Sequence, residues 1–293
     1  MGKQLGIKYF NGEPYENIQV KHDSANNVST EHSIISLDAW KKILDYYKSL
    51  APGKMRDQDR EPVLQFTNLF ITKKFLLPGG SFPSTSYIKI DPGNHWIYAA
   101  DAFDSSINIY NTYLQRIGKY NIHGVLIDMQ FSLPLQQRGE RSGVLTNIGI
   151  MNPNDLKTGT ADTFYFTKNA SLSYLKQVLD SMPRPVQTAS VDLDKDGKQD
   201  YLVCGFGNTT GALYWVKNEG NRKFEQKIMR PLPGAIKAYI DDYNHDGLPD
   251  IMVLMAQAWE GIYLFTNKGN GMFDTREVLQ FPAVYGSSYF ELD

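Results

Sequence analysis

Four aspartates crowd into nine positions of the chain, and their oxygens could bind a hard cation. They lie in the segment VDLDKDGKQD, residues 191–200, as Asp192, Asp194, Asp196 and Asp200. Alternating acidic positions place several oxygens on the inside of a tight turn, and Gly197 can supply the positive φ that such a turn requires. Two carboxylates about 4 Å apart repel each other by about 4 kcal/mol at an effective dielectric near 20, so a cation would stabilise the loop.

The same pattern recurs 50 residues later, which makes the loop part of a repeat. Calcium takes oxygen ligands from carboxylates, carbonyls and water, and we predict two structural calcium sites. The ligands would be the side chains of Asp192, Asp194, Asp196 and Asp200 with the Lys198 carbonyl, and those of Asp242, Asn244, Asp246 and Asp250 with the Leu248 carbonyl. The alternative is an unmetallated Asp/Gly turn whose side chains cap the backbone, and recurrence in register disfavours it.

Neither loop fits an EF-hand, and the predicted metal is structural rather than catalytic. An EF-hand needs a Glu at its twelfth position, where this chain has Val203 and Val253, both in β-type runs. Aspartates that surround a cation leave little room for a substrate, and no neighbouring Cys indicates a transition metal. His245 lies between ligands of the second loop, and we expect it to point into solvent.

The segments around the acidic loops predict the elements that carry them. Residues 186–234 and 235–284 each read as strand, acidic loop, strand, turn, strand, Asn-Gly turn and strand, with Gly211–Trp215 aligned on Gly261–Phe265. A repeat of this length with four strands is typical of one β-propeller blade. Because a blade buries its faces against its neighbours, we expect the core to lie between blades.

Other segments look like degenerate or partial copies of the same unit. Runs of short strands predict blades over roughly 86–121 and 124–180, the second with a long insertion. Residues 170–182 could be helical, and we predict a strand for their latter part. A further repeat starts at 285, and Asp293 would be the first aspartate of its acidic loop. We therefore expect a truncated repeat and an incomplete propeller.

The predicted class is all-β, with a short N-terminal helical segment. An irregular or helical segment covers residues 1–58, and the partial propeller covers residues 59–293. Ser36 is a plausible N-cap of a helix over 36–50, whose apolar face would include Trp40 and Tyr47.

Composition limits the classes of partner and compartment. Hydrophobic residues make up 42% of the 293 residues, and the formal net charge of −2 gives no electrostatic reason to expect a nucleic-acid partner. Cys204 is the single cysteine, so no internal disulfide can form. The sequence has no apolar run long enough to cross a bilayer, and its first residues lack a signal peptide.

With these residues in view, 186–293 resemble FG-GAP/VCBS-type repeats, the calcium-loop propeller blades also seen in integrin-like heads. The resemblance rests on DLDKDGKQDYLV and DYNHDGLPDIMV, each followed by a Gly, an aromatic strand and an Asn-x-Gly turn, and on CGFGN at 204–208. It implies an extracellular or periplasmic location.

A narrower resemblance covers more of the chain. The order LGIKYFNGEPY, LDAWKKILDYYKSLAP and then the propeller is similar to exported bacterial FG-GAP proteins that begin with a cytochrome c-like segment. Residues 1–58 could be a remnant of such a segment. The chain has no Cys-x-x-Cys-His motif, so haem attachment is not carried over.

The sequence favours a non-enzymatic calcium-binding propeller that serves as a binding or scaffold module for a protein or glycan ligand. The rival hypothesis is a carbohydrate-active or haem-linked redox enzyme with other segments outside this chain. Its candidate loop residues are Glu140 and Arg141 in the insertion, and Gln257, Trp259 and Glu260 after the DIMVLMA strand. Trp259 beside Glu260 could stack on a sugar. A third hypothesis is a purely structural repeat.

Overall fold

The computed structural model divides the chain into two compact units, Met1–Ser81 and Phe82–Asp293. The residues that the structure describes are 7–10, 13–16, 35–51, 84–132, 139–207, 209–221, 223–257, 260–282 and 287–291. Within the first unit, β1 (Ile7–Phe10) pairs antiparallel with β2 (Glu13–Glu16), and α1 spans Leu37–Leu50.

Helix α1 begins where the sequence predicts. The Ser36 side chain accepts a hydrogen bond of 3.1 Å from the backbone N–H of Ala39, which satisfies one of the free donors of the first turn. Trp40 is buried, but Tyr47 is 64% exposed, so the prediction that Tyr47 belongs to a buried apolar face is wrong. No helix in the described part of the chain is long and apolar enough to cross a membrane.

Four four-stranded antiparallel sheets follow one another in the second unit, and we call them blades 1 to 4. Blade 1 consists of β3 (Thr85–Asp91), β4 (Trp96–Asp101), β5 (Ser106–Tyr110) and β6 (Arg116–Asn121). Blade 2 consists of β7 (Leu126–Phe131), β8 (Arg141–Asn147), β9 (Gly159–Phe166) and β10 (Leu172–Met182). Blade 3 consists of β11 (Pro185–Val191), β12 (Asp200–Gly205), β13 (Ala212–Gly220) and β14 (Lys223–Arg230). Blade 4 consists of β15 (Ala235–Asp241), β16 (Asp250–Met255), β17 (Gly261–Asn267) and β18 (Phe273–Gln280).

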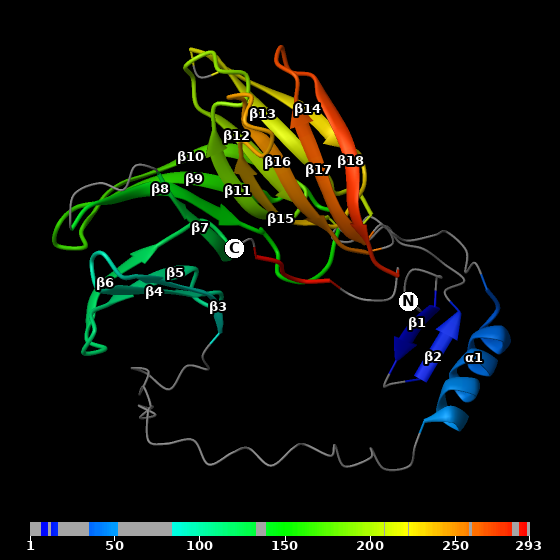
Figure 1. Ribbon diagram of the computed structural model, residues 1–293. Helices are drawn as coiled ribbons and strands as arrows, with labels where there is room; N and C mark the ends of the chain where they lie inside the picture. The colour runs from blue at the N-terminus through cyan, green and yellow to red at the C-terminus, as the bar shows by residue number, and fades with distance from the viewer. Residues whose placement is uncertain are drawn as a thin grey trace, which may run out of the picture. The chain divides into compact units, whose positions relative to one another are not determined.

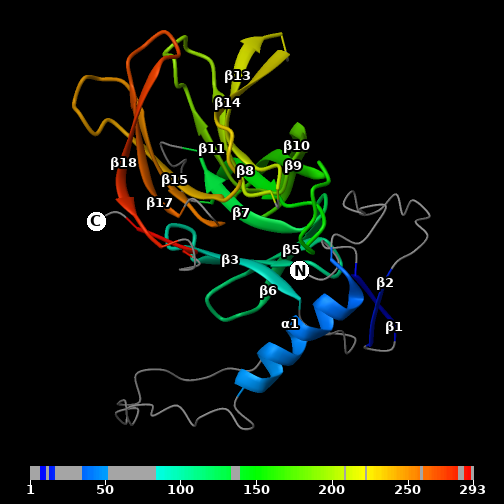
Figure 2. The ribbon, with the colours of Figure 1, turned by 90° about the vertical axis from the view of Figure 1, so that its right-hand side faces the viewer.

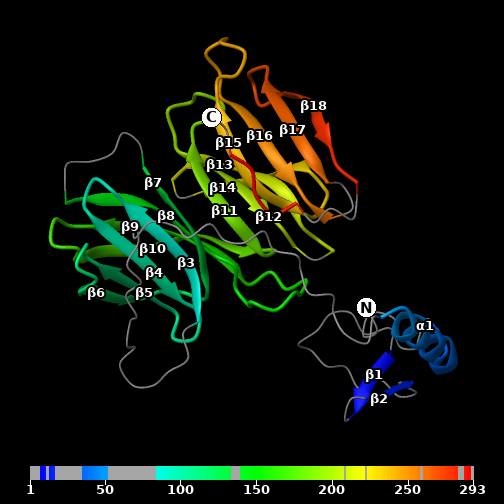
Figure 3. The ribbon, with the colours of Figure 1, turned by 60° about the horizontal axis from the view of Figure 1, so that its bottom comes forward.

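Strands that are consecutive in the chain are neighbours in every blade, so each sheet is a simple meander (Figure 1). The first strands of successive blades contact each other, β3 with β7, β7 with β11, and β11 with β15. The fourth strand of each blade lies at a sheet edge, as β18 does at the left of Figure 2. Figure 3 shows blades 1 and 2 on the left of the second unit and blades 3 and 4 on its right. This blade-like arrangement confirms the predicted fold class.

The hydrophobic core lies between neighbouring blades rather than within one blade. Three buried clusters include Tyr98, Met129 and Phe164 for blades 1 and 2, Val144, Ala161 and Val203 for blades 2 and 3, and Leu202, Ile251 and Phe265 for blades 3 and 4. Burying one such side chain contributes about 1.5–3 kcal/mol. A single blade has no such core, because the partner side chains come from the next blade.

The strand predicted for the latter part of residues 170–182 is confirmed, and the helical possibility for this segment is wrong. Residues 172–182 form the strand β10 along their whole length, so no helix lies there. The ladder between β10 and β9 shifts register near Leu172, Leu179 and Met182. These irregularities break the alternation of inward and outward side chains, and the resulting spacing of apolar residues imitates that of a helix.

Candidate metal centre

The two acidic loops occupy the same place in blades 3 and 4. Each joins the first strand of its blade to the second, residues 192–199 between β11 and β12 and residues 242–249 between β15 and β16. The two strands pair at the base of each loop, with Val191 opposite Asp200 in blade 3 and Asp241 opposite Asp250 in blade 4. The antiparallel pairing of the two strands therefore holds both ends of each loop together.

The first loop is folded around the carboxylate of Asp192. Its Oδ1 accepts from the backbone N–H of Asp196 at 3.1 Å, and its Oδ2 accepts from that of Gly197 at 2.9 Å. Gly197 has a φ of 82°, as the sequence predicts, and a Cβ there would meet nothing within 4 Å. The loop therefore needs glycine for its backbone conformation and not for space.

Asp200 fastens this loop to the rest of blade 3. It is fully buried, and its Oδ1 accepts from the backbone N–H of Asn218 at 2.8 Å. Its Oδ2 accepts from the indole N–H of Trp215 at 2.8 Å. Burial raises the pKa of Asp200, because the ionised form loses its hydration. These bonds fix the carboxylate at the base of the loop.

The second loop repeats this geometry almost bond for bond. Asp242 accepts from the backbone N–H groups of Asp246 and Gly247 at 3.0 and 2.8 Å. Asp250 is fully buried and accepts from the backbone N–H of Asn267 at 2.7 Å. Gly247 has a φ of 83°. His245, also in this loop, is exposed, as predicted. The backbone conformation thus recurs with the residue pattern, but among the described residues only the first loop brings three carboxylates together, since Asn244 replaces Asp194 in the second.

A side-chain amide ties the two loops to each other. Asn267 of blade 4 donates from Nδ2 to the backbone oxygen of Leu193 in the first loop at 2.8 Å. The same amide group donates to the backbone oxygen of Pro249 in the second loop at 3.1 Å. Asn267 is fully buried, so loss of either bond would leave a buried carbonyl without its donor.

Asp194 provides the test of whether the first loop fits a cation. Its Oδ1 is buried and receives no hydrogen bond from the residues that the structure describes. Oxygen atoms of Asp192, Asp194 and Asp200 all lie within 4.8 Å of one another. Each carboxylate oxygen that already accepts one hydrogen bond keeps a second lone pair. These three carboxylates could therefore hold a metal ion, and an all-oxygen set suits a hard cation.

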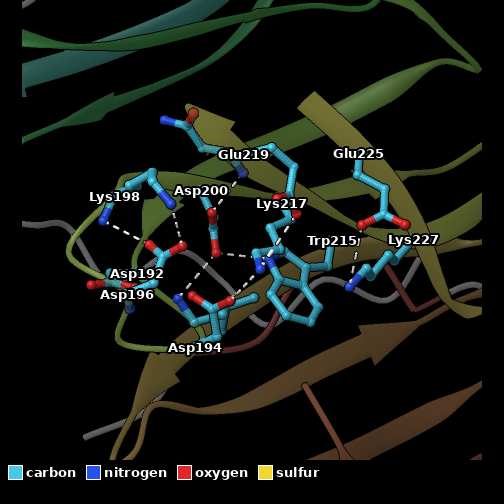
Figure 4. Close-up of polar contacts among 12 residues, drawn as sticks. Asp192, Asp194, Asp196, Lys198, Asp200, Trp215, Lys217, Glu219, Glu225 and Lys227 are labelled. Carbon is cyan, nitrogen blue, oxygen red and sulfur yellow. Dashed lines mark hydrogen bonds and ion pairs between the residues drawn. The ribbon is translucent and has the colours of Figure 1, made fainter. Parts of the chain in front are cut away.

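Two lysines already balance part of the charge of the first loop (Figure 4). Lys217 Nζ lies 2.9 Å from Asp194 Oδ2, and Lys198 Nζ lies 2.8 Å from Asp196 Oδ2. The hydrogen bond to Asp194 raises the pKa of Lys217. The hydrogen bond from Lys198 lowers the pKa of Asp196. The sequence pattern alone gave no sign of the contact of Lys217, since it joins residues 23 positions apart on a loop and a strand.

Strand register corrects one detail of the repeat alignment. Gly205 pairs with Ala212 in blade 3, and Met255 pairs with Gly261 in blade 4, so Ala212 and Gly261 are equivalent. The alignment of Gly211 on Gly261 is therefore wrong by one residue. The physical reason is that blade 3 has a longer turn before its third strand than blade 4.

The loop residues considered for an enzyme have other surroundings. Arg141 is buried and pairs with Asp91 of blade 1, with Nε 2.7 Å from Asp91 Oδ2. Glu260 is 3% exposed, and its Oε2 accepts from the backbone N–H of Ser287 at 3.1 Å. Both side chains are buried and bond to other segments of the fold, and neither is exposed at the edge of a blade.

The other three loop candidates for an enzyme site are Glu140, Gln257 and Trp259. Glu140 precedes Arg141 and is partly exposed. Gln257 has a positive φ of 63° and is partly exposed. Trp259 lies outside the described residues, so its pairing with Glu260 on a sugar stays a prediction.

Comparisons with known proteins agree with the loops and the blades. Residues 192–253 match the model of the FG-GAP-like repeat family. Integrin alpha-PS5 of Drosophila melanogaster is 34% identical over 96 residues, which cover 28% of this chain and 10% of the integrin. This chain thus spans about a tenth of that relative's length.

A likeness to one solved structure is looser. A luciferin-regenerating enzyme matches at 11% identity with a TM-score of 0.39, over 67% of this chain and 61% of the other. Fold and site together define a protein of four-stranded, blade-like sheets with acidic loops between first and second strands. Residues 192–253 are similar to an FG-GAP-like repeat, and the integrin relative supports this similarity.

Proposed function

We propose that this chain is a calcium-stabilised, non-enzymatic propeller module of an exported protein, located outside the cell or in the periplasm. Its role would be to present a binding or scaffold surface to a protein or glycan ligand. FG-GAP-like repeats are binding modules, and millimolar calcium outside cells suits low-affinity sites of this kind.

One observation carries the metal part of the proposal. The same loop conformation occurs twice, and in the first copy the Oδ1 of Asp194 is buried without a donor among the described residues. An acceptor in that condition costs about 1–3 kcal/mol unless another partner satisfies it. A calcium ion would supply that partner and would neutralise the neighbouring carboxylates.

The ligands would be those that the repeat pattern predicts. In the first loop they are Asp192, Asp194, Asp196, the Lys198 carbonyl and Asp200, and in the second Asp242, Asn244, Asp246, the Leu248 carbonyl and Asp250. The bound ion would contribute positive charge only. The chain's own residues shape the loop, because Asp200 and Asp250 anchor it to the third strand through Asn218 and Asn267.

Thermal unfolding tests the metal claim. We expect millimolar calcium to raise the melting temperature and a chelator to reverse the rise, since a ligand that binds only the folded state stabilises it. The variant with Asp194→Ala and Asn244→Ala should show no such shift. Asp104→Ala, which removes an exposed carboxylate of blade 1, is the matched control and should keep it. A wild-type melting temperature that ignores both calcium and chelator would refute the proposal.

The binding role needs a separate test. A glycan array and a screen of candidate protein ligands should identify a partner whose binding requires folded blades. Hydrolysis or redox turnover of any ligand so found would contradict the non-enzymatic assignment.

A further inference from the structure

A lysine side chain, Lys217, forms an ion pair with the first acidic loop, and among the described residues the second loop has no equivalent. Lys217 comes from β13 and reaches the side chain of Asp194, which is 12% exposed while that of Lys217 is 20% exposed. Figure 4 shows the ammonium group between Asp194 and Glu219. Because most of this pair is out of solvent, water screens it less than it screens an ion pair on the open surface.

Strand register identifies the residue that replaces this lysine in blade 4. Lys217 pairs with Glu225 in blade 3, and Thr266 pairs with Asp274 in blade 4. The neighbouring pairs, Asn218 with Phe224 and Asn267 with Phe273, keep the same order. Lys217 and Thr266 are therefore equivalent, and the second loop has an uncharged side chain where the first has an ammonium.

The other loop positions add to this difference. Asn244 stands where the first loop has Asp194, and Leu248 stands where it has Lys198. Among the described residues, no lysine or arginine lies within 4.0 Å of a carboxylate of Asp242, Asp246 or Asp250. The first loop thus has four aspartates and two paired lysines, whereas the second has three aspartates and no paired lysine. In the second loop, no paired lysine of the described chain offsets the three aspartates.

We infer that Lys217 competes with a divalent cation for Asp194, so that the first loop is the weaker calcium site in spite of its extra aspartate. This inference rests on the calcium proposal above. A cation that uses both oxygens of Asp194 must displace the ammonium group. Lys217 can then turn toward Glu219, whose Oε1 already lies 3.4 Å away. In the second loop a cation displaces no charged group.

Calorimetric titration of the full chain with calcium alone would test this order. The wild type should bind in two classes, and a matched pair of exposed positions assigns them. Asp246→Ala should remove the tight class, and Asp196→Ala should remove the weak class.

The decisive variant is Lys217→Thr, which copies the residue of blade 4. It should tighten the weak class by about tenfold, the order expected when one charge-assisted hydrogen bond no longer has to be broken. Lys217→Arg keeps the charge and should leave that class weak. Lys227→Thr is the control, because it removes a neighbouring lysine that lies over Trp215 and not on the loop.

The possible results separate the inference from the calcium proposal. Tightening in Lys217→Thr alone would support the inference. Calcium binding with an unchanged weak class in Lys217→Thr, or with the tight class lost in Asp196→Ala, would overturn the inference and leave the calcium proposal standing. No calcium binding by the folded wild type would overturn both.

Discussion

The ion pair of Arg141 with Asp91 joins blades 1 and 2, and its removal should be among the most destabilising single changes in the second unit. Arg141 Nε lies 2.7 Å from Asp91 Oδ2, and its Nη2 donates to Asp91 Oδ1 at 2.8 Å. Each side chain is 3% exposed. Arg141 is the first residue of β8, the second strand of blade 2. The guanidinium of Arg141, at the start of β8, thus neutralises the buried Asp91, and the segment of the sequence before β8 has no acidic repeat.

The size of the destabilisation follows from the buried carboxylate of Asp91, which loses its positively charged partner. In Arg141→Met, Asp91 keeps the backbone donors of Gly93 and Asn94 at 3.1 and 3.3 Å but loses its counter-ion. Two unit charges about 4 Å apart interact by about 4 kcal/mol at an effective dielectric near 20. Loss of one partner of a buried pair typically costs about 3–5 kcal/mol, which agrees. We therefore expect the free energy of unfolding to fall by about 4 kcal/mol.

Urea unfolding of the full chain, followed by tryptophan fluorescence and circular dichroism, would measure this change. The double variant Arg141→Met with Asp91→Asn should recover most of the loss, because no buried charge then lacks a partner. Lys119→Met is the control, since its pair with Asp104 is about 40% exposed on both sides and should matter by less than about 1 kcal/mol. A loss below about 1 kcal/mol in Arg141→Met, or no recovery in the double variant, would refute this reasoning.

Three further changes follow from the same structure. Burial raises the pKa of Asp128, so the folded protein keeps this proton to a higher pH than the unfolded chain does. Stability therefore falls as the pH rises from about 4, the pKa of an aspartate in the unfolded chain, to the raised pKa of the folded state. Asp128→Asn should remove this pH dependence of stability and raise the stability at pH 8 by about 1 kcal/mol. Melting temperatures at pH 5 and pH 8 would measure both effects, and an unchanged pH dependence would show that other groups cause it. Gly197→Ala should cost about 1–2 kcal/mol in thermal unfolding from its φ of 82° alone, and a much larger loss would mean that space also matters. Gln187→Leu should cost about 2 kcal/mol or more in urea unfolding, since Gln187 exchanges hydrogen bonds of 2.6 and 3.1 Å with the backbone of Ala238; a neutral result would show that water replaces them.

The repeat made most of the fold of blades 3 and 4 predictable. The aspartates and the glycine at fixed spacing make the same hydrogen bonds in both copies, so the repeated pattern in Asp192–Asp200 and Asp242–Asp250 gives a repeated loop. Local chemistry also placed the start of α1 at Ser36. Features that depend on a few neighbouring residues are therefore readable from sequence.

Contacts between distant residues were not readable in this way. Nothing near Arg141 in the chain indicates Asp91, which is 50 positions away, and nothing near Asp194 indicates Lys217. These side chains meet only after the blades have packed. The alignment error at Gly211 has a similar origin, because strand pairing and not residue identity decides where the extra residue of a turn lies.

The number of calcium ions bound per folded chain tests the central claim most directly. Equilibrium dialysis at millimolar calcium should give two ions for the wild type, and one each for the Asp194→Ala and Asn244→Ala variants. Dialysis of the double variant should give none, while circular dichroism confirms that the blades remain folded. Two ions retained by the double variant, or none bound by the folded wild type, would contradict the account.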